Sequence, residues 1–144
     1  MLVLALLAGC ATFAPEEPRT LLEVNEWRMY GLERADPGPV QIDAYVAMSR
    51  CAAADIHSSA PVLDQIVWLK ADSIVPPEAH ARNPRGVSLS PGNRIVIVRS
   101  AWFDFDLNAH ELLHQLIGPG VPHSDPAFRR CDPLYPDFYY PETY

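Results

Sequence analysis

The 144-residue chain contains a single lysine, Lys70, and its formal net charge is −7. Affinity for nucleic acids rests largely on Lys and Arg contacts to phosphates, and the 11 basic residues form no continuous stripe. We therefore expect no nucleic-acid partner. The chain also lacks an apolar run of membrane-spanning length and any internal repeat. Its size suits one domain with one modest core.

Residues 1–9 form a short apolar run that ends in Leu7-Ala8-Gly9, directly before Cys10. Nine apolar residues are too few to span a bilayer as a helix. The segment resembles a bacterial lipoprotein signal with its lipobox, although no Lys or Arg precedes Cys10. The resemblance implies a signal peptide over 1–9, a lipidated Cys10, a tether over 10–20 and anchoring to the cell envelope, with the outer membrane favoured. The alternative is an apolar strand or helix of the core.

With Cys10 as the lipid site, two cysteines remain, Cys51 and Cys131. Because the cell envelope is oxidising, we expect them to form a disulfide. That bridge would tie the first long helix to the segment after the motif described below. Two separate buried thiols, or Cys131 as a zinc ligand, are the alternatives.

Hydrophobic spacing and turn residues predict an α+β fold with a small, mostly antiparallel sheet packed on two helices. The strand over 94–98 is apolar on both faces, which places it inside the sheet. Residues 21–144 form the predicted domain. The expected elements are a helix over 21–34, a helix over 40–57, a strand within 62–75, a hairpin over 86–99, a helix from Asp104 or Asp106 to Ile117, and irregular chain from Val121 to Tyr144.

The motif His110-Glu111-Leu112-Leu113-His114 lies on the last of these helices. The spacing of four residues puts both imidazoles on one face, where they can bind one Zn²⁺. Glu111 then lies beside the metal without binding it. From there it can accept a proton from a zinc-bound water whose pKa the metal has lowered. The motif therefore predicts Glu111 as the catalytic base.

Catalytic zinc usually has three protein ligands, so a third residue must join His110 and His114. His123 is the best candidate, because the Gly118-Pro119-Gly120 turn can bring the chain back under the metal. Asp125 and Asp132 are weaker candidates, and a surface role for His123 is the alternative. The histidines at 57 and 80 are expected at the surface.

The motif resembles the zincin metallopeptidases over about residues 62–128, which implies a zincin-like minimal domain. The subfamily stays open: the Gly and His spacing after His114 differs from that of metzincins, and the only later Glu is Glu142. His123 followed by Phe128 is similar to SprT-like and WLM peptidases. The resemblance implies a substrate-pairing strand edge, at 62–75 or 86–90. It also leaves open a transition-state donor among the tyrosines 135, 139, 140 and 144.

These observations favour a zinc-dependent metallopeptidase of the cell envelope that acts on a peptide or protein substrate. The alternative is a non-catalytic zinc-binding lipoprotein that serves as a structural or binding module. A chance motif on an interaction protein is a third reading. The sequence does not indicate the substrate or the oligomeric state.

Overall fold

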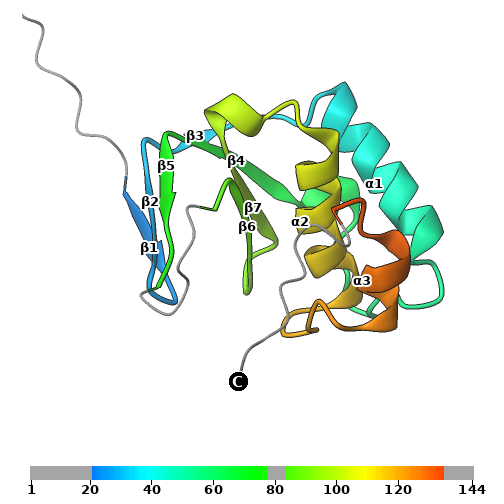
Figure 1. Ribbon diagram of the computed structural model, residues 1–144. Helices are drawn as coiled ribbons and strands as arrows, with labels where there is room; N and C mark the ends of the chain where they lie inside the picture. The colour runs from blue at the N-terminus through cyan, green and yellow to red at the C-terminus, as the bar shows by residue number, and fades with distance from the viewer. Residues whose placement is uncertain (1–20, 78–83, 135–144) are drawn as a thin grey trace, which may run out of the picture.

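The computed structural model describes residues 21–77 and 84–134 (Figure 1). The predictions on the signal segment, Cys10, the tether, His80 and the four C-terminal tyrosines lie outside these residues. The described part of the chain is α+β, as expected. Its elements are β1 (Leu22–Val24), β2 (Trp27–Tyr30), β3 (Glu33–Arg34), α1 (Pro39–Cys51), β4 (Val67–Ala71), β5 (Ser73–Val75), β6 (Gly86–Leu89), β7 (Arg94–Val98), α2 (Phe105–Ile117) and α3 (Pro126–Cys131), with short 3₁₀ turns at Leu63–Gln65 and Arg99–Ala101.

The strands form two small sheets, ordered β1-β2-β5 and β3-β4-β7-β6. All pairings are antiparallel except β4 with β7, which is parallel. The predicted hairpin is confirmed, since β6 and β7 pair antiparallel across the turn at 90–93. Strand β7 lies between β4 and β6, which confirms its predicted place inside a sheet.

Figure 1 shows three layers, with the helices on the right, the four-stranded sheet in the middle and the three-stranded sheet on the left. Successive side chains of β7 point to opposite faces of the four-stranded sheet. Ile95 and Ile97 pack against the helices, whereas Val96 packs against the three-stranded sheet. Trp68 and Trp102 are 1% and 4% exposed, and their rings meet edge to face with centroids 6.1 Å apart. The motif helix α2 therefore rests on a sheet that is covered on both faces.

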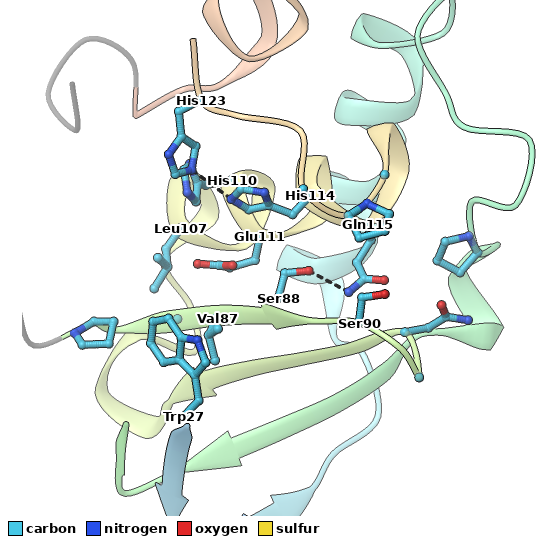
Figure 2. Close-up of a pocket in the computed structure, with 18 of the residues that line it drawn as sticks. Trp27, Val87, Ser88, Ser90, Leu107, His110, Glu111, His114, Gln115 and His123 are labelled. Carbon is cyan, nitrogen blue, oxygen red and sulfur yellow. Dashed lines mark hydrogen bonds between the residues drawn. The ribbon is translucent and has the colours of Figure 1, made fainter. Parts of the chain in front are cut away.

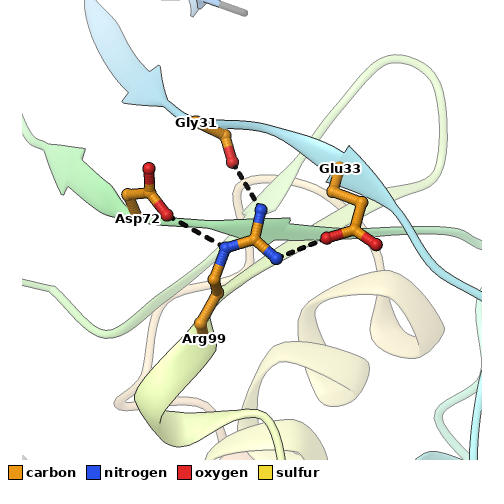
Figure 3. A network of polar contacts seen from close by, with 4 residues as sticks. All are labelled: Gly31, Glu33, Asp72 and Arg99. Atoms are coloured by element: carbon orange, nitrogen blue, oxygen red, sulfur yellow. Dashed lines mark hydrogen bonds and ion pairs between the residues drawn. The ribbon is translucent and has the colours of Figure 1, made fainter. Parts of the chain in front are cut away.

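Arg99 holds the junction where one sheet passes into the other (Figure 3). Its guanidinium donates to the carbonyl oxygen of Gly31 at 3.0 Å and to Asp72 Oδ1 at 2.9 Å, and it also pairs with Glu33. Gly31 lies between β2 and β3 with φ +64, and a Cβ there would overlap the Asp72 carboxylate. The pairs β2–β5 and β3–β4 can therefore continue one another through a bend.

The Cys51–Cys131 disulfide is confirmed, with a Cα–Cα distance of 5.7 Å. It joins the last residue of α1 to the last residue of α3. A sequence separation of 80 residues corresponds to about 4 kcal/mol in the chain-entropy account of disulfide stabilisation. None of the helices in the described part of the chain is long and apolar enough to cross a membrane.

Three predicted elements are corrected by the structure. Residues 21–34 form strands β1, β2 and β3 rather than a helix, and the helix predicted over 40–57 ends at Cys51. Residues 126–131 form the short helix α3 within a segment expected to be irregular.

The β1–β2 turn consists of Asn25 and Glu26, both with positive φ, and Glu is a rare residue for such a turn. The usual hairpin signal was therefore missing from the sequence.

Candidate metal centre and its cleft

Helix α2 places three of the predicted site residues, His110, Glu111 and His114. Asp104 precedes its first residue, and the Asp104 carboxylate accepts a hydrogen bond from the Leu107 N–H at 3.1 Å, so Asp104 rather than Asp106 is the cap. Most of the helix is buried between the sheet and α1. The motif residues are therefore fixed on a rigid, covered element.

The chain returns to the motif through a turn that contains Gly118 and Gly120, with φ of +109 and +78. This return brings His123 beside the motif, as the sequence predicted. One nitrogen from each of His110, His114 and His123 lies within 4.8 Å of the other two. Nε2 of His114 and Nε2 of His123 are 2.9 Å apart. Three imidazoles thus converge on one point.

Asp132 fixes the orientation of the His110 ring. Nδ1 of His110 lies 2.8 Å from Oδ2 of Asp132, and both residues are buried. A protonated Nδ1 that donates to this carboxylate leaves the Nε2 lone pair for a metal ion. Histidine ligands of metals commonly have such a carboxylate partner, which raises their basicity and fixes the tautomer.

Phe128, on α3, forms an apolar support for all three rings. Its centroid lies 5.9, 4.7 and 5.0 Å from those of His110, His114 and His123, and the side chain has no solvent exposure. A buried aromatic group at this place limits the rotamers open to the imidazoles. It therefore contributes to preorganisation of the three nitrogens.

The pKa values of His110 and His114 are shifted in opposite directions. Burial, helped by the charges of His110 and His123, lowers the pKa of His114 to about 3, so this ring is neutral at neutral pH. Burial also acts to lower the pKa of His110. There the Asp132 hydrogen bond and the charges of Glu111 and Asp132 outweigh burial, and the pKa lies above its usual value.

Glu111 is 5% exposed and lies against strand β6 (Figure 2). Burial raises the pKa of its carboxyl to about 7, against the lowering effects of His110 and of the Ser88 backbone hydrogen bond. Gly86 makes room for this side chain, because a Cβ there would lie 2.9 Å from Oε1 of Glu111. A carboxyl with a pKa near neutrality is suited to accept and return protons.

The three histidines and Glu111 line a cleft of about 840 Å³ along the edge of β6. Within residues 21–77 and 84–134, β6 pairs with β7 alone, which leaves its other edge toward the cleft. Gln115 ties α2 to this strand, because its Nε2 donates to Oγ of Ser88 at 2.6 Å (Figure 2). Two segments were expected to offer a substrate edge. Of these, 86–90 contains β6 and lies at the site. In 62–75, β4 is internal to its sheet, and β5 is an edge strand of the other, three-stranded sheet.

The other sequence candidates have different roles. Asp125 caps α3, where its carboxylate accepts from the Ala127 N–H at 2.8 Å, and Cys131 is in the disulfide, so neither is a ligand. Asp132 is the hydrogen-bond partner of His110 and is not one of the three histidines that could hold an ion. His57 is exposed at the cleft rim and stands outside the histidine group, in agreement with the expected surface role. Sequence reasoning missed the roles of Gly86 and Phe128, which depend on contacts between distant segments.

The donor set fits a transition metal that prefers nitrogen ligands. Three imidazole nitrogens are a common protein set for catalytic zinc, and the buried His110–Asp132 pair orients one of them. No protein-family model matches the chain, and no match was found among curated proteins or solved structures. The function is therefore inferred from the site itself.

Proposed function

We propose that the protein is a zinc-dependent peptidase of the zincin type, with His110, His114 and His123 as ligands and Glu111 as the catalytic base. The observation that carries the proposal is the buried Glu111 carboxyl, which lies beside three converging imidazoles at an open strand edge. A purely structural zinc site has no use for a base at this place, and such sites are usually closed by a fourth protein ligand.

The three imidazole nitrogens would hold the zinc, which when bound supplies a Lewis acid that polarises a peptide carbonyl and lowers the pKa of water. Glu111 takes one proton from the attacking water as its oxygen bonds to the carbonyl carbon. The same carboxyl then delivers the proton to the departing amine nitrogen as the C–N bond breaks. A pKa of about 7 suits both transfers at neutral pH.

The substrate of this proposal is an extended peptide segment that adds to the free edge of β6. Such β-augmentation uses backbone donors and acceptors, so it tolerates many sequences. The Ser88 N–H already donates to Glu111, so the remaining groups of the edge would bind the substrate backbone. The cleft has lining residues on both sides of Glu111, with Leu107 on one side and Ser90 on the other (Figure 2), which gives room on both sides of the site.

We also propose an envelope location, with the chain anchored through a lipid on Cys10. The support is the apolar segment 1–9 that ends at the lipobox-like Leu7-Ala8-Gly9-Cys10. The Cys51–Cys131 disulfide supports an oxidising compartment, because such bonds are rare in reducing ones.

The test is hydrolysis of a denatured protein by the full chain with one equivalent of zinc, with new amino termini mapped by mass spectrometry. We expect cleavage by the wild type, and a rate at least a hundredfold lower for Glu111→Gln with zinc retained. The exposed Glu23→Gln serves as the matched control and should cleave at the wild-type rate. Equal cleavage by Glu111→Gln, or none by the wild type, contradicts the proposal.

A further inference from the structure

The last residue that the structure describes, Leu134, lies at the metal centre. Leu134 lines the same cleft as Glu111 and His123. It is half-buried, and its side chain packs against the core cluster that contains Leu112 and Phe128. The chain that follows Leu134 in the sequence therefore starts at the wall of the cleft.

The carboxylate of Asp132 fixes this starting point. Its Oδ1 accepts a hydrogen bond from the Leu134 N–H at 2.9 Å, and its Oδ2 lies 2.8 Å from Nδ1 of His110. Asp132 also follows Cys131, whose disulfide ties α3 to α1. The side chain that orients a metal-site histidine thus also holds the backbone from which the next residues leave.

The sequence of residues 135–144 is Tyr-Pro-Asp-Phe-Tyr-Tyr-Pro-Glu-Thr-Tyr, with five aromatic residues and no Lys or Arg. Pro136 and Pro141 enclose the stretch 137–140, Asp-Phe-Tyr-Tyr. Because proline has no N–H to donate to a strand ladder, the stretch between the two prolines is the part that can pair as a strand. Phe and Tyr are residues that favour strands.

Strand β6 offers a matching edge. It has four residues, Gly86–Leu89, as many as the stretch 137–140, and among the described residues it pairs with β7 alone. The connection from Leu134 to residue 137 can span about 10 Å when extended, because a strand advances about 3.3 Å per residue. Since Leu134 and β6 line one cleft of about 840 Å³, such a connection is enough to enter it.

We propose that residues 137–140 add to the free edge of β6 as a further strand and compete there with substrate. The competition rests on the proposed peptidase function, whereas occupation of the cleft does not. A short connection gives an intramolecular partner an effective concentration of about 1 mM, so even a Kd of about 0.1 mM keeps the cleft occupied about ten times as often as free. The site would then be autoinhibited by its own chain.

Occupation is tested by NMR on the ¹⁵N-labelled Glu111→Gln full chain with zinc, in which hydrolysis is suppressed. The triple substitution Phe138→Ser/Tyr139→Ser/Tyr140→Ser should shift the amide signals of β6 and speed their hydrogen exchange at least about tenfold, while the signals of α1 stay in place. Phe103→Ser, which removes a 78% exposed ring outside the cleft lining, is the matched control and should leave β6 unchanged.

A second measurement supplies the segment as a separate molecule. The peptide acetyl-Pro-Asp-Phe-Tyr-Tyr-Pro-amide should bind the triple variant at least about tenfold more tightly than the chain with its own segment intact, and should shift the β6 amides. The same residues with one proline moved between the aromatic residues serve as the control peptide, which should not bind.

Unchanged β6 signals in the triple variant, equal binding of the peptide to both chains, or no binding to either overturns the inference. With Glu111 intact, the triple variant should hydrolyse denatured protein with a KM at least about tenfold lower and an unchanged kcat. Hydrolysis with equal KM also overturns the inference. The NMR changes without hydrolysis by either chain contradict only the proposed function.

Discussion

A single hydrogen bond between Asp132 and His110 decides which ring nitrogen is available to a metal ion. The carboxylate is buried and lies 22 residues along the chain from its partner, so nothing local in the sequence indicates the pair. The motif gave His110, Glu111 and His114 because helical spacing is a local property. The contact of Asp132 with His110 depends on how α3 packs against α2, and the spacing of residues within a motif does not predict that packing.

We predict that Asp132→Asn lowers metal affinity by about 10- to 100-fold, because the amide no longer supplies a charge that fixes the Nδ1–H tautomer. The measurement is zinc competition against a chromophoric chelator. The exposed Asp106→Asn, in the first turn of α2, is the control for loss of one negative charge and should change affinity little. An unchanged affinity in Asp132→Asn would contradict an orienting role.

Glu111 gives a prediction about stability and pH in the metal-free protein. Its folded pKa of about 7 lies above the unfolded value of 4.5. Below pH 4.5, Glu111 is protonated in both the folded and the unfolded chain, and its ionisation costs no stability. As the pH rises from 4.5 through 7, the unfolded chain ionises first, so the free energy of unfolding falls. Glu111→Gln removes this loss, so it should raise the free energy of unfolding by about 2 kcal/mol more at pH 8 than at pH 5.

This difference is measured by urea unfolding in EDTA at the two pH values. The exposed Glu23→Gln controls for the general loss of a carboxylate. A stability gain that is equal at pH 5 and pH 8 would show that burial does not raise the pKa of Glu111 in the folded protein.

At the scale of elements, strand β6 and helix α2 approach closely at Gly86. A Cβ there would meet Oε1 of Glu111 at 2.9 Å and the side chain of Ile97 at 3.0 Å. We predict that Gly86→Ala moves the Glu111 carboxyl, destabilises the fold by about 1–3 kcal/mol and slows any hydrolysis. Gly38→Ala at the start of α1, where the nearest contact is 3.4 Å, is the matched control.

The Gly86 prediction is checked by thermal unfolding and by the hydrolysis assay on both glycine variants. A Gly86→Ala protein with wild-type stability and activity would mean that the strand and helix separate without cost. In that case Gly86 does not position the base.

The elements differ in how far the sequence predicted them. Helix α2 and the β6–β7 hairpin were predicted because Asp104, the apolar period and Ser90-Pro91-Gly92-Asn93 are local signals. Strands β1 to β3 were missed because they are short and their turn lacks glycine. Helix α3 has six residues, and its signals, Asp125 as cap and Pro126 in the first turn, were too brief to outweigh the many nearby prolines.

At the scale of the molecule, the disulfide ties the end of α3, beside the three-histidine group, to the end of α1. Cys131 directly precedes Asp132, and α3 also carries Phe128 beneath the three imidazoles. The double variant Cys51→Ser/Cys131→Ser should lose about 2–4 kcal/mol of unfolding free energy and should bind zinc more weakly. Reduction of the wild type should give the same changes. Wild-type zinc affinity in the double variant would contradict a link between the disulfide and the site.

The three-histidine metal centre is tested most directly by the zinc content of the full chain after supply of micromolar zinc and gel filtration. The wild type is compared with Glu111→Gln and His123→Ala. We predict one zinc per chain in the wild type and in Glu111→Gln, and its loss in His123→Ala, because three imidazoles form the site. No zinc in the wild type, or full zinc in His123→Ala, would contradict the three-histidine metal centre and the peptidase built on it.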